Sequence, residues 1–242
     1  MWFAWIGVAL AVDAGHAGLQ RALDGRVVAG RVDYAALKAA PQALDGYLAD
    51  VAAASLPGMS AAEKKAFYVN AYNALTLDLV ADNYPLASIR DLDGGKPWSA
   101  RRFKVAGRDL TLDDIEHKEL RPLGDPRIHA AINCAAVGCP PLAPKVFTAA
   151  NLDAQLDVAA RAWAATAALK DGVLTLNAIF DWFGDDFVPT YGARRFDIPG
   201  LDGKAEAAAN FVAAYAPDKA EALKKGGYTV KYAAYDWALN RK

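Results

Sequence analysis

The stretch SAAEKKAFYVNAYNALTLDLVADN, residues 60–83, predicts the central element of the fold. Ser60 followed three residues later by Glu63 is a capping box, in which each side chain bonds the other residue's backbone N–H. The pair Tyr84-Pro85 ends the helical pattern, because proline does not continue a helix. We therefore expect one strong helix from Ser60 to about Asn83.

Further helices are expected on both sides of this central helix. Residues 34–54 are rich in Ala and Leu, and Pro41 divides them into two short helices. Thr111 caps a helix that ends before Pro122, with acidic residues in its first turns, where the helix dipole favours negative charge. Three more helices are expected nearer the C-terminus, at residues 148–169, 201–215 and 218–225.

Strands are fewer and shorter than helices. Residues 102–110 predict a hairpin that turns at Gly107, and residues 127–133, 173–176 and 228–235 predict single strands. The chain shows neither the regular strand–helix alternation of a doubly wound sheet nor a linker. We therefore expect one mostly helical α+β domain, with a small antiparallel sheet packed against helices.

The composition excludes several classes of protein. Of the 242 residues, 54% are hydrophobic and 23% are charged, which is typical of a globular chain and not of a disordered one. Lys and Arg number 27 and Asp and Glu number 28, so the net charge of −1 gives no reason to expect a nucleic-acid partner. The two cysteines can form at most one disulfide. The composition does not indicate an oligomeric state.

The N-terminus predicts export. Residues 2–12 form an apolar run of eleven residues, which is too short to span a membrane but fits the centre of a signal peptide. Small residues follow where a signal peptidase would cut. The alternative is an N-terminal helix docked on the domain. We expect a signal peptide at residues 1–17, a single domain at residues 18–242, a periplasmic or secreted protein, and no membrane span.

The segment DPRIHAAINC, residues 125–134, is the densest polar cluster in the chain. If residues 127–133 form a strand, Arg127 and His129 share one face and Cys134 lies on the apolar face. Gly138 precedes Cys139 and two prolines follow it, so this cysteine is expected in a stiff, exposed loop. A nucleophile needs such a fixed position.

These residues predict a thiol enzyme. A free cysteine has a pKa near 8.5, and a neighbouring imidazolium lowers that pKa and makes the thiolate the resting form. Cys139 is the expected nucleophile, His129 the base, and Glu116 the group that orients the imidazole. Three other carboxylates compete for that last role: Asp114, Asp125 and Asp236. The predicted activity is hydrolysis or acyl transfer at an amide or peptide-like bond of a peptide or small molecule, with no cofactor and no metal.

Other interpretations of the cysteines stay open at this stage. Cys134 and Cys139 can form a structural disulfide in a non-catalytic binding or interaction module of the cell envelope. With His129 and one further ligand they can bind a metal, although the spacing is not a standard zinc pattern. They can also be small buried hydrophobic residues.

Two further groups of residues are candidates for the site. Asn70 and Asn73 share one face of the central helix, where their amides either satisfy a loop backbone or serve the active site as oxyanion donors, and with Arg127 they form the predicted substrate-binding set. Residues 181–187, which mix acids and aromatics, predict either a packed helix end or a cleft wall. The tryptophans outside the predicted signal peptide are expected in the core: Trp98, Trp163, Trp182 and Trp237. Residues 235–240 are expected to fix the last strand to the domain.

Five segments resemble the bacterial and plant family called domain of unknown function 547. They are FYVNAYNALTL (67–77), YPLASIRDL (84–92), LTLDDIEHKELR (110–121), DPRIHAAINCAAVGCPPL (125–142) and YDWALN (235–240). The family motif carries a Glu, a His and Cys residues, which fall here on Glu116, His129, Cys134 and Cys139. A more distant likeness to papain-like and transglutaminase-like thiol enzymes implies a rearranged papain-like core, because both cysteines here follow the histidine.

Overall fold

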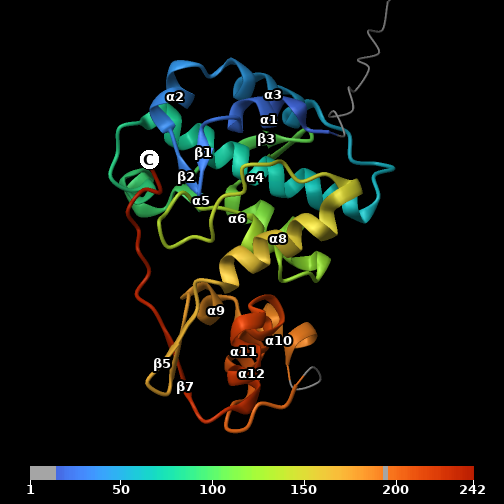
Figure 1. The fold of residues 1–242 in the computed structure, drawn as a ribbon. Helices are drawn as coiled ribbons and strands as arrows, with labels where there is room; N and C mark the ends of the chain where they lie inside the picture. Colours follow the sequence, from blue (N-terminus) through green and yellow to red (C-terminus); the bar gives the residue numbers. More distant parts are fainter. Residues whose placement is uncertain (1–14, 193–195) are drawn as a thin grey trace, which may run out of the picture.

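The computed structural model describes residues 15–192 and 196–242 (Figure 1). The predicted signal peptide, residues 1–17, lies outside the described residues except for its last three positions. Within the described ranges, no helix combines the length and apolar character that crossing a membrane requires.

Most of the ordered elements are helices. The longer ones are α1 (Ala17–Leu23), α3 (Gln42–Ala53), α4 (Ala61–Asn83), α8 (Leu152–Ala164), α10 (Gly184–Tyr191), α11 (Gly203–Tyr215) and α12 (Pro217–Lys225). Shorter ones are α2 (Tyr34–Ala39), α5 (Pro97–Ala100), α6 (Leu112–Asp114), α7 (Ile128–Ala131) and α9 (Ile179–Trp182). One π-helical turn, η3 (Ile115–Leu120), continues α6. Short 3₁₀ turns are η1 (Ile89–Asp91), η2 (Asp93–Gly95), η4 (Arg121–Leu123) and η5 (Ala149–Asn151).

The strands form small sheets. Antiparallel pairs join β1 (Val27–Val28) to β2 (Arg31–Val32), β3 (Phe103–Val105) to β4 (Arg108–Leu110), and β5 (Ala168–Lys170) to β6 (Val173–Leu176). The last strand, β7 (Thr229–Tyr232), pairs parallel with β6. The prediction of a mostly helical α+β domain with small antiparallel sheets is confirmed, and the parallel pair is an addition to it.

Helix α4 is the centre of the upper part of the molecule in Figure 1. It begins with the predicted capping box: the Ser60 N–H donates to Glu63 Oε2 at 2.7 Å, and the Glu63 N–H donates to Ser60 Oγ at 3.2 Å. Every residue from Ala66 to Leu77 is buried. Since a helix that is buried all round must be covered on every side, the neighbouring elements α2, α3, α6 and η3 pack against it.

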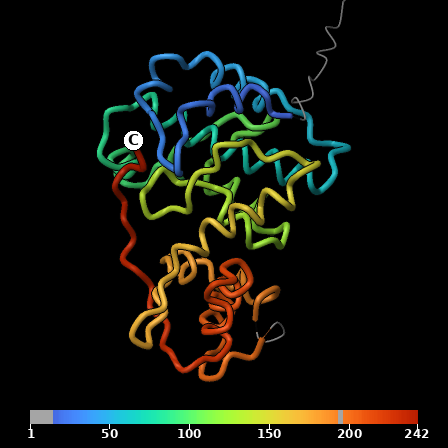
Figure 2. The backbone as a smooth tube through the Cα atoms, in the orientation of Figure 1, coloured from blue at the N-terminus to red at the C-terminus, as the bar shows by residue number. Residues whose placement is uncertain are grey.

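The lower part of Figure 1 holds β5–β7 and α9–α12, and α8 lies between the two parts. An aromatic cluster packs this region, with the rings of Trp163 and Phe180 stacked at 4.1 Å and Phe211 in contact with both. After β7 the chain runs back to the upper part (Figure 2). This returning segment brings residues 235–240 against the loop after α7, where Gly138 N–H donates to the Asp236 carbonyl.

The predicted strand at residues 127–133 is wrong. These residues begin with helix α7, in which the Ile132 N–H donates to the Ile128 carbonyl at 3.0 Å, and they become extended only afterwards. Period-two alternation over seven residues does not distinguish a strand from a short helical turn. The helix predicted at residues 148–169 also ends early, at Ala164, because residues 168–170 form β5.

Candidate functional site

A pocket of about 160 Å³ is lined by residues from both parts of the molecule, among them Tyr72 on α4 and Trp182 on α9. Glu116, His129, Cys134 and Cys139 all line it, so the fold brings the predicted catalytic residues to one hollow. The other acidic and histidine residues in its lining are Asp113 and His117. The aromatic lining residues are Tyr72, Trp98, Trp182, Phe183, Tyr235 and Trp237.

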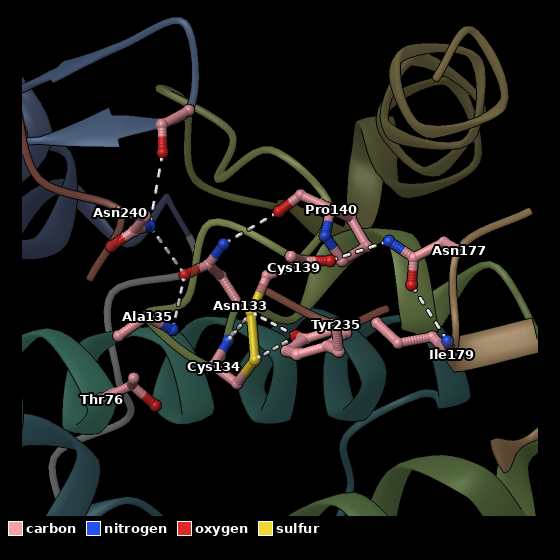
Figure 3. Close-up of a disulfide and its surroundings, with 12 residues drawn as sticks. Thr76, Asn133, Cys134, Ala135, Cys139, Pro140, Asn177, Ile179, Tyr235 and Asn240 are labelled. Atoms are coloured by element: carbon pink, nitrogen blue, oxygen red, sulfur yellow. Dashed lines mark hydrogen bonds between the residues drawn. A yellow bond between two sulfur atoms is a disulfide. The ribbon is translucent and has the colours of Figure 1, made fainter. Parts of the chain in front are cut away.

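The two cysteines form a disulfide on the wall of this pocket (Figure 3). The hydroxyl of Tyr235 lies 2.9 Å from Cys134 Sγ and donates to Cys139 Sγ at 3.2 Å. The backbone N–H of Cys134 also donates to Cys139 Sγ, at 3.0 Å. The expected exposures are reversed: Cys139 is buried and Cys134 is half-buried, because residue 134 follows a helical turn and does not lie on the inner face of a strand.

Polar side chains fix the loop that carries the disulfide. Asn133 donates to the Pro140 carbonyl at 2.8 Å and accepts from the Ala135 N–H at 2.9 Å. Asn177 donates to the Gly138 carbonyl at 2.8 Å (Figure 3). Gly138 itself permits the close approach of Tyr235, because a Cβ at this position would lie 3.0 Å from that ring.

His129 is held from two sides by carboxylates. Its Nε2 lies 2.8 Å from Asp186 Oδ2, and its Nδ1 lies 3.7 Å from Glu116 Oε1, which is beyond hydrogen-bond length. The ring of Phe183 stacks on the imidazole, with centroids 4.5 Å apart. Asp186 therefore orients the ring, and Nδ1 is left on the side of Glu116. The sequence assigned the orienting role to Glu116, with Asp114, Asp125 and Asp236 as competitors, so Asp186 was missed.

Burial sets the protonation states here. Desolvation, followed by the nearby charge of Asp113, raises the pKa of Glu116 to about 7. Desolvation also lowers the pKa of His129, against the opposing effect of Asp186, so the imidazole is neutral at neutral pH. Glu116 lies on the π-helical turn η3, a type of turn that occurs often at functional sites. A carboxyl group with a pKa near 7 can both give and take a proton at physiological pH.

Asp186 keeps its negative charge. Burial alone would raise the pKa of Asp186, but hydrogen bonds from Arg121 and His129 outweigh it and hold that pKa well below its usual range. Arg121 binds both carboxylate oxygens of Asp186, at 2.7 and 2.8 Å. A charged carboxylate bonded to Nε2 fixes the tautomer in which Nδ1 carries the lone pair.

The predicted substrate-binding residues lie elsewhere, and they do not line this pocket. Asn70 donates to the Phe147 carbonyl and accepts from the Phe147 N–H, at 2.7 and 3.0 Å. Asn73 bonds the Ala131 carbonyl and the Asn133 N–H in the same way, at 2.9 and 2.8 Å. Both amides thus satisfy loop backbone, which is the structural alternative that the sequence left open.

Arg127 belongs to a cluster of ion pairs outside the pocket. Its guanidinium contacts Asp125 at 3.0 Å, Asp153 at 2.6 Å and Asp157 at 2.7 Å. Lys65 also binds Asp125, at 2.8 Å. Among the described residues, no group of three or more His, Cys, Asp or Glu is arranged to hold a metal ion.

Several residues of the site come from parts of the sequence that were assigned structural roles. Trp182 and Phe183 line the pocket, so residues 181–187 do form part of a cleft wall. Trp98 and Trp237 line it too, whereas Trp163 is the only one of the described tryptophans that lies fully in the core. The mixture of acids and aromatics at residues 181–187 was the available signal for Asp186.

A comparison with models of protein families found a match over part of the chain. Residues 56–163 match the family model described as Protein of unknown function, DUF547. The predicted resemblance to this family is confirmed over these residues, which are a little under half of the chain. The matched segment contains Glu116, His129 and both cysteines, whereas Asp186 and Tyr235 lie beyond it. No curated protein and no solved structure matches the chain. The likeness to papain-like enzymes therefore stays a prediction.

Proposed function

We propose that this DUF547 protein is a thiol-dependent hydrolase or acyl transferase that acts on an amide or peptide-like bond once its disulfide is reduced. One observation carries the proposal: a sulfur pair, an imidazole and a carboxyl group with a pKa near 7 line the same pocket. These are the groups that nucleophilic catalysis by a thiol needs in one place.

Reduction is the first step of the proposed mechanism. A dithiol reductant supplies two electrons and two protons, the Cys134–Cys139 bond breaks, and the reductant becomes a disulfide. Both cysteines are then thiols. The expected compartment is the periplasm or the exterior, where the oxidised form persists, so the reductant would control the activity.

Cys139 is the proposed nucleophile, because two donors point at its sulfur. The Cys134 N–H and the Tyr235 O–H lie 3.0 and 3.2 Å from Cys139 Sγ. Hydrogen bonds donated to a thiolate favour the charged form and lower the pKa of the thiol. Burial raises the pKa of Tyr235, so that its hydroxyl stays protonated and able to donate.

The proposed reaction first acylates Cys139 and then releases the acyl group. The Cys139 thiol gives its proton to Nδ1 of His129, while Asp186 stabilises the imidazolium through Nε2. The thiolate attacks the carbonyl carbon, the carbon–nitrogen bond breaks, and the amine leaves with the proton from His129. Water or a second amine next attacks the thioester and gives a proton to His129. The carbon–sulfur bond breaks, His129 returns the proton to Cys139, and the products are an acid or a new amide and the free thiol. Tyr235 is the side-chain donor nearest the sulfur and would hold the oxyanion.

A second candidate function is favoured by the disulfide itself. A non-catalytic envelope module would keep Cys134–Cys139 as a permanent link in a pocket that binds without chemistry. The two functions predict different thiols after reduction. The enzyme requires one reactive thiol, whereas the module requires none.

Alkylation rates test the proposal. Cys134→Ala leaves Cys139 as the sole cysteine, and Cys139→Ala leaves Cys134. At pH 7 we expect iodoacetamide to alkylate Cys134→Ala at least tenfold faster than Cys139→Ala, with circular dichroism showing that both variants are folded. If iodoacetamide alkylates both variants at the same rate as an unperturbed thiol, the non-catalytic envelope module is the better account. If it alkylates Cys139→Ala faster than Cys134→Ala, Cys139 is not the nucleophile.

A further inference from the structure

The aromatic residues of the pocket form one continuous wall. The ring of Trp237 lies 5.6 Å from that of Trp98 and 4.4 Å from that of Tyr235, and Tyr235 lies 4.8 Å from Trp182, all measured between ring centroids. Trp182 is 48% exposed, so the wall reaches from the disulfide to the surface. The mouth of the pocket is therefore lined largely by aromatic rings, whose faces carry partial negative charge.

The charges that the lining itself can carry near neutral pH are negative. Asp113 and Glu116 line the pocket, and no Lys or Arg does among the described residues. Desolvation lowers the pKa of both lining histidines, so they are uncharged at neutral pH. Two cations lie beside lining rings: Arg121, which both oxygens of Asp186 bind, and Arg90, which lies over Trp237.

Rings of this pocket already attract cations of the same chain. The guanidinium carbon of Arg90 lies 5.0 Å from the centroid of Trp237, and that of Arg121 lies 5.2 Å from the centroid of Phe183. Both distances are within the range of a cation–π interaction. The ring faces that border the pocket therefore have the electrostatic character that a cationic ligand requires.

We infer that the pocket recognises a small alkylammonium group, so that the substrate is an amide or peptide-like compound with a positively charged amine near the bond that breaks. The claim that a bond near the amine is cleaved rests on the proposed function, whereas the claim that the pocket binds an ammonium group does not. Aromatic faces together with carboxylates are the usual means of binding ammonium groups. A volume of about 160 Å³ suits a head group of this size. Since burial raises the pKa of both Asp113 and Glu116, a bound cation would also favour their charged forms.

A matched pair of ligands tests the charge directly. Choline carries a trimethylammonium group, and 3,3-dimethylbutan-1-ol has the same shape without the charge. Isothermal titration at pH 8 and constant ionic strength, on the oxidised wild-type protein, should give a choline Kd at least about tenfold lower than that of the alcohol. Trp182→Leu should weaken choline binding about tenfold and leave binding of the alcohol within about threefold.

Phe196→Leu is the control variant, because Phe196 is an exposed ring that stacks on Lys224 outside the pocket. It should leave the choline Kd unchanged. Equal Kd values for choline and the alcohol would overturn the inference in favour of a merely apolar pocket, and so would the absence of choline binding. The two tests are independent, because choline binding is measured on the oxidised protein, which has no thiol. A lack of choline binding would reject this inference and leave the proposed function standing. Equal alkylation rates would count against the proposed function and leave this inference standing.

Discussion

Arg127 and His129 are two residues apart in the chain, yet the guanidinium has a full set of charged partners and the imidazole does not. Arg127 contacts three carboxylates, and none of its bonds faces the pocket. His129 has one ring nitrogen bonded to Asp186, and the other lies 3.7 Å from Glu116 in a hollow. A saturated charge holds a fold together, whereas a titratable group without a full set of partners, beside a cavity, is available for chemistry.

Removing the imidazole should have the largest effect. In a Cys134→Ala background, which needs no reductant, we expect His129→Gln to slow nitrophenolate release from p-nitrophenyl acetate by about 10²–10⁴-fold, the usual contribution of a general base. The glutamine amide can still donate to Asp186, so the free energy of unfolding should fall by no more than about 1 kcal/mol. An unchanged rate would remove His129 from the mechanism.

Removing the charge of Arg127 should lower the stability of the protein and leave the reaction rate unchanged. Arg127→Met leaves three acidic side chains without their common partner, and we expect the free energy of unfolding to fall by about 3 kcal/mol in urea denaturation. The nitrophenolate rate per folded molecule should not change. If the rate drops as far as it does in His129→Gln, the two regions are not separate and the comparison fails.

The pH dependence of stability should single out Glu116. The folded protein keeps a proton on this group between pH 4.5 and about 7 that the unfolded chain releases. The contribution of Glu116 to the free energy of unfolding is therefore complete below pH 4.5, and it is lost as the pH rises to 7. Between pH 5 and pH 8 the wild type should lose up to about 3 kcal/mol relative to Glu116→Gln. Glu221→Gln, at an exposed helix position, should follow the wild type at both pH values.

The smallest effect is expected at the edge of the Arg127 cluster. The Asp153 side chain is 89% exposed, so its ion pair with Arg127 is screened by water. We expect Asp153→Asn to change the free energy of unfolding by less than about 1 kcal/mol. A loss as large as that of Arg127→Met would mean that this exposed pair, and not the buried contact with Asp125, holds the cluster.

Local signals in the sequence predicted much of the fold. Ser60 and Glu63 marked the start of α4, Pro41 separated α2 from α3, and Gly107 marked the β3–β4 hairpin. Each of these depends on residues that are close in the chain, so the backbone there follows its own side chains. The error at residues 127–133 has the same origin, because a short alternating pattern fits either a strand or a single helical turn.

The site was harder to predict, because its contacts join distant segments. Glu116, His129 and the cysteines were found because they cluster within residues 116–139. Asp186 and Tyr235 contact them from 57 and 96 residues further along the chain, and nothing local to either residue indicates its partner. Tertiary packing alone brings residues 181–187 and 235–237 to the pocket.

The most direct test of the account is the pH dependence of alkylation of Cys139 in the Cys134→Ala variant. If the pocket activates this sulfur, the rate of reaction with iodoacetamide should reach half its plateau at or below about pH 7.5, and His129→Gln should move that midpoint upward. A midpoint near pH 8.5 in both variants is the value for an unperturbed thiol, and it would contradict the claim that this hollow is built for thiol chemistry.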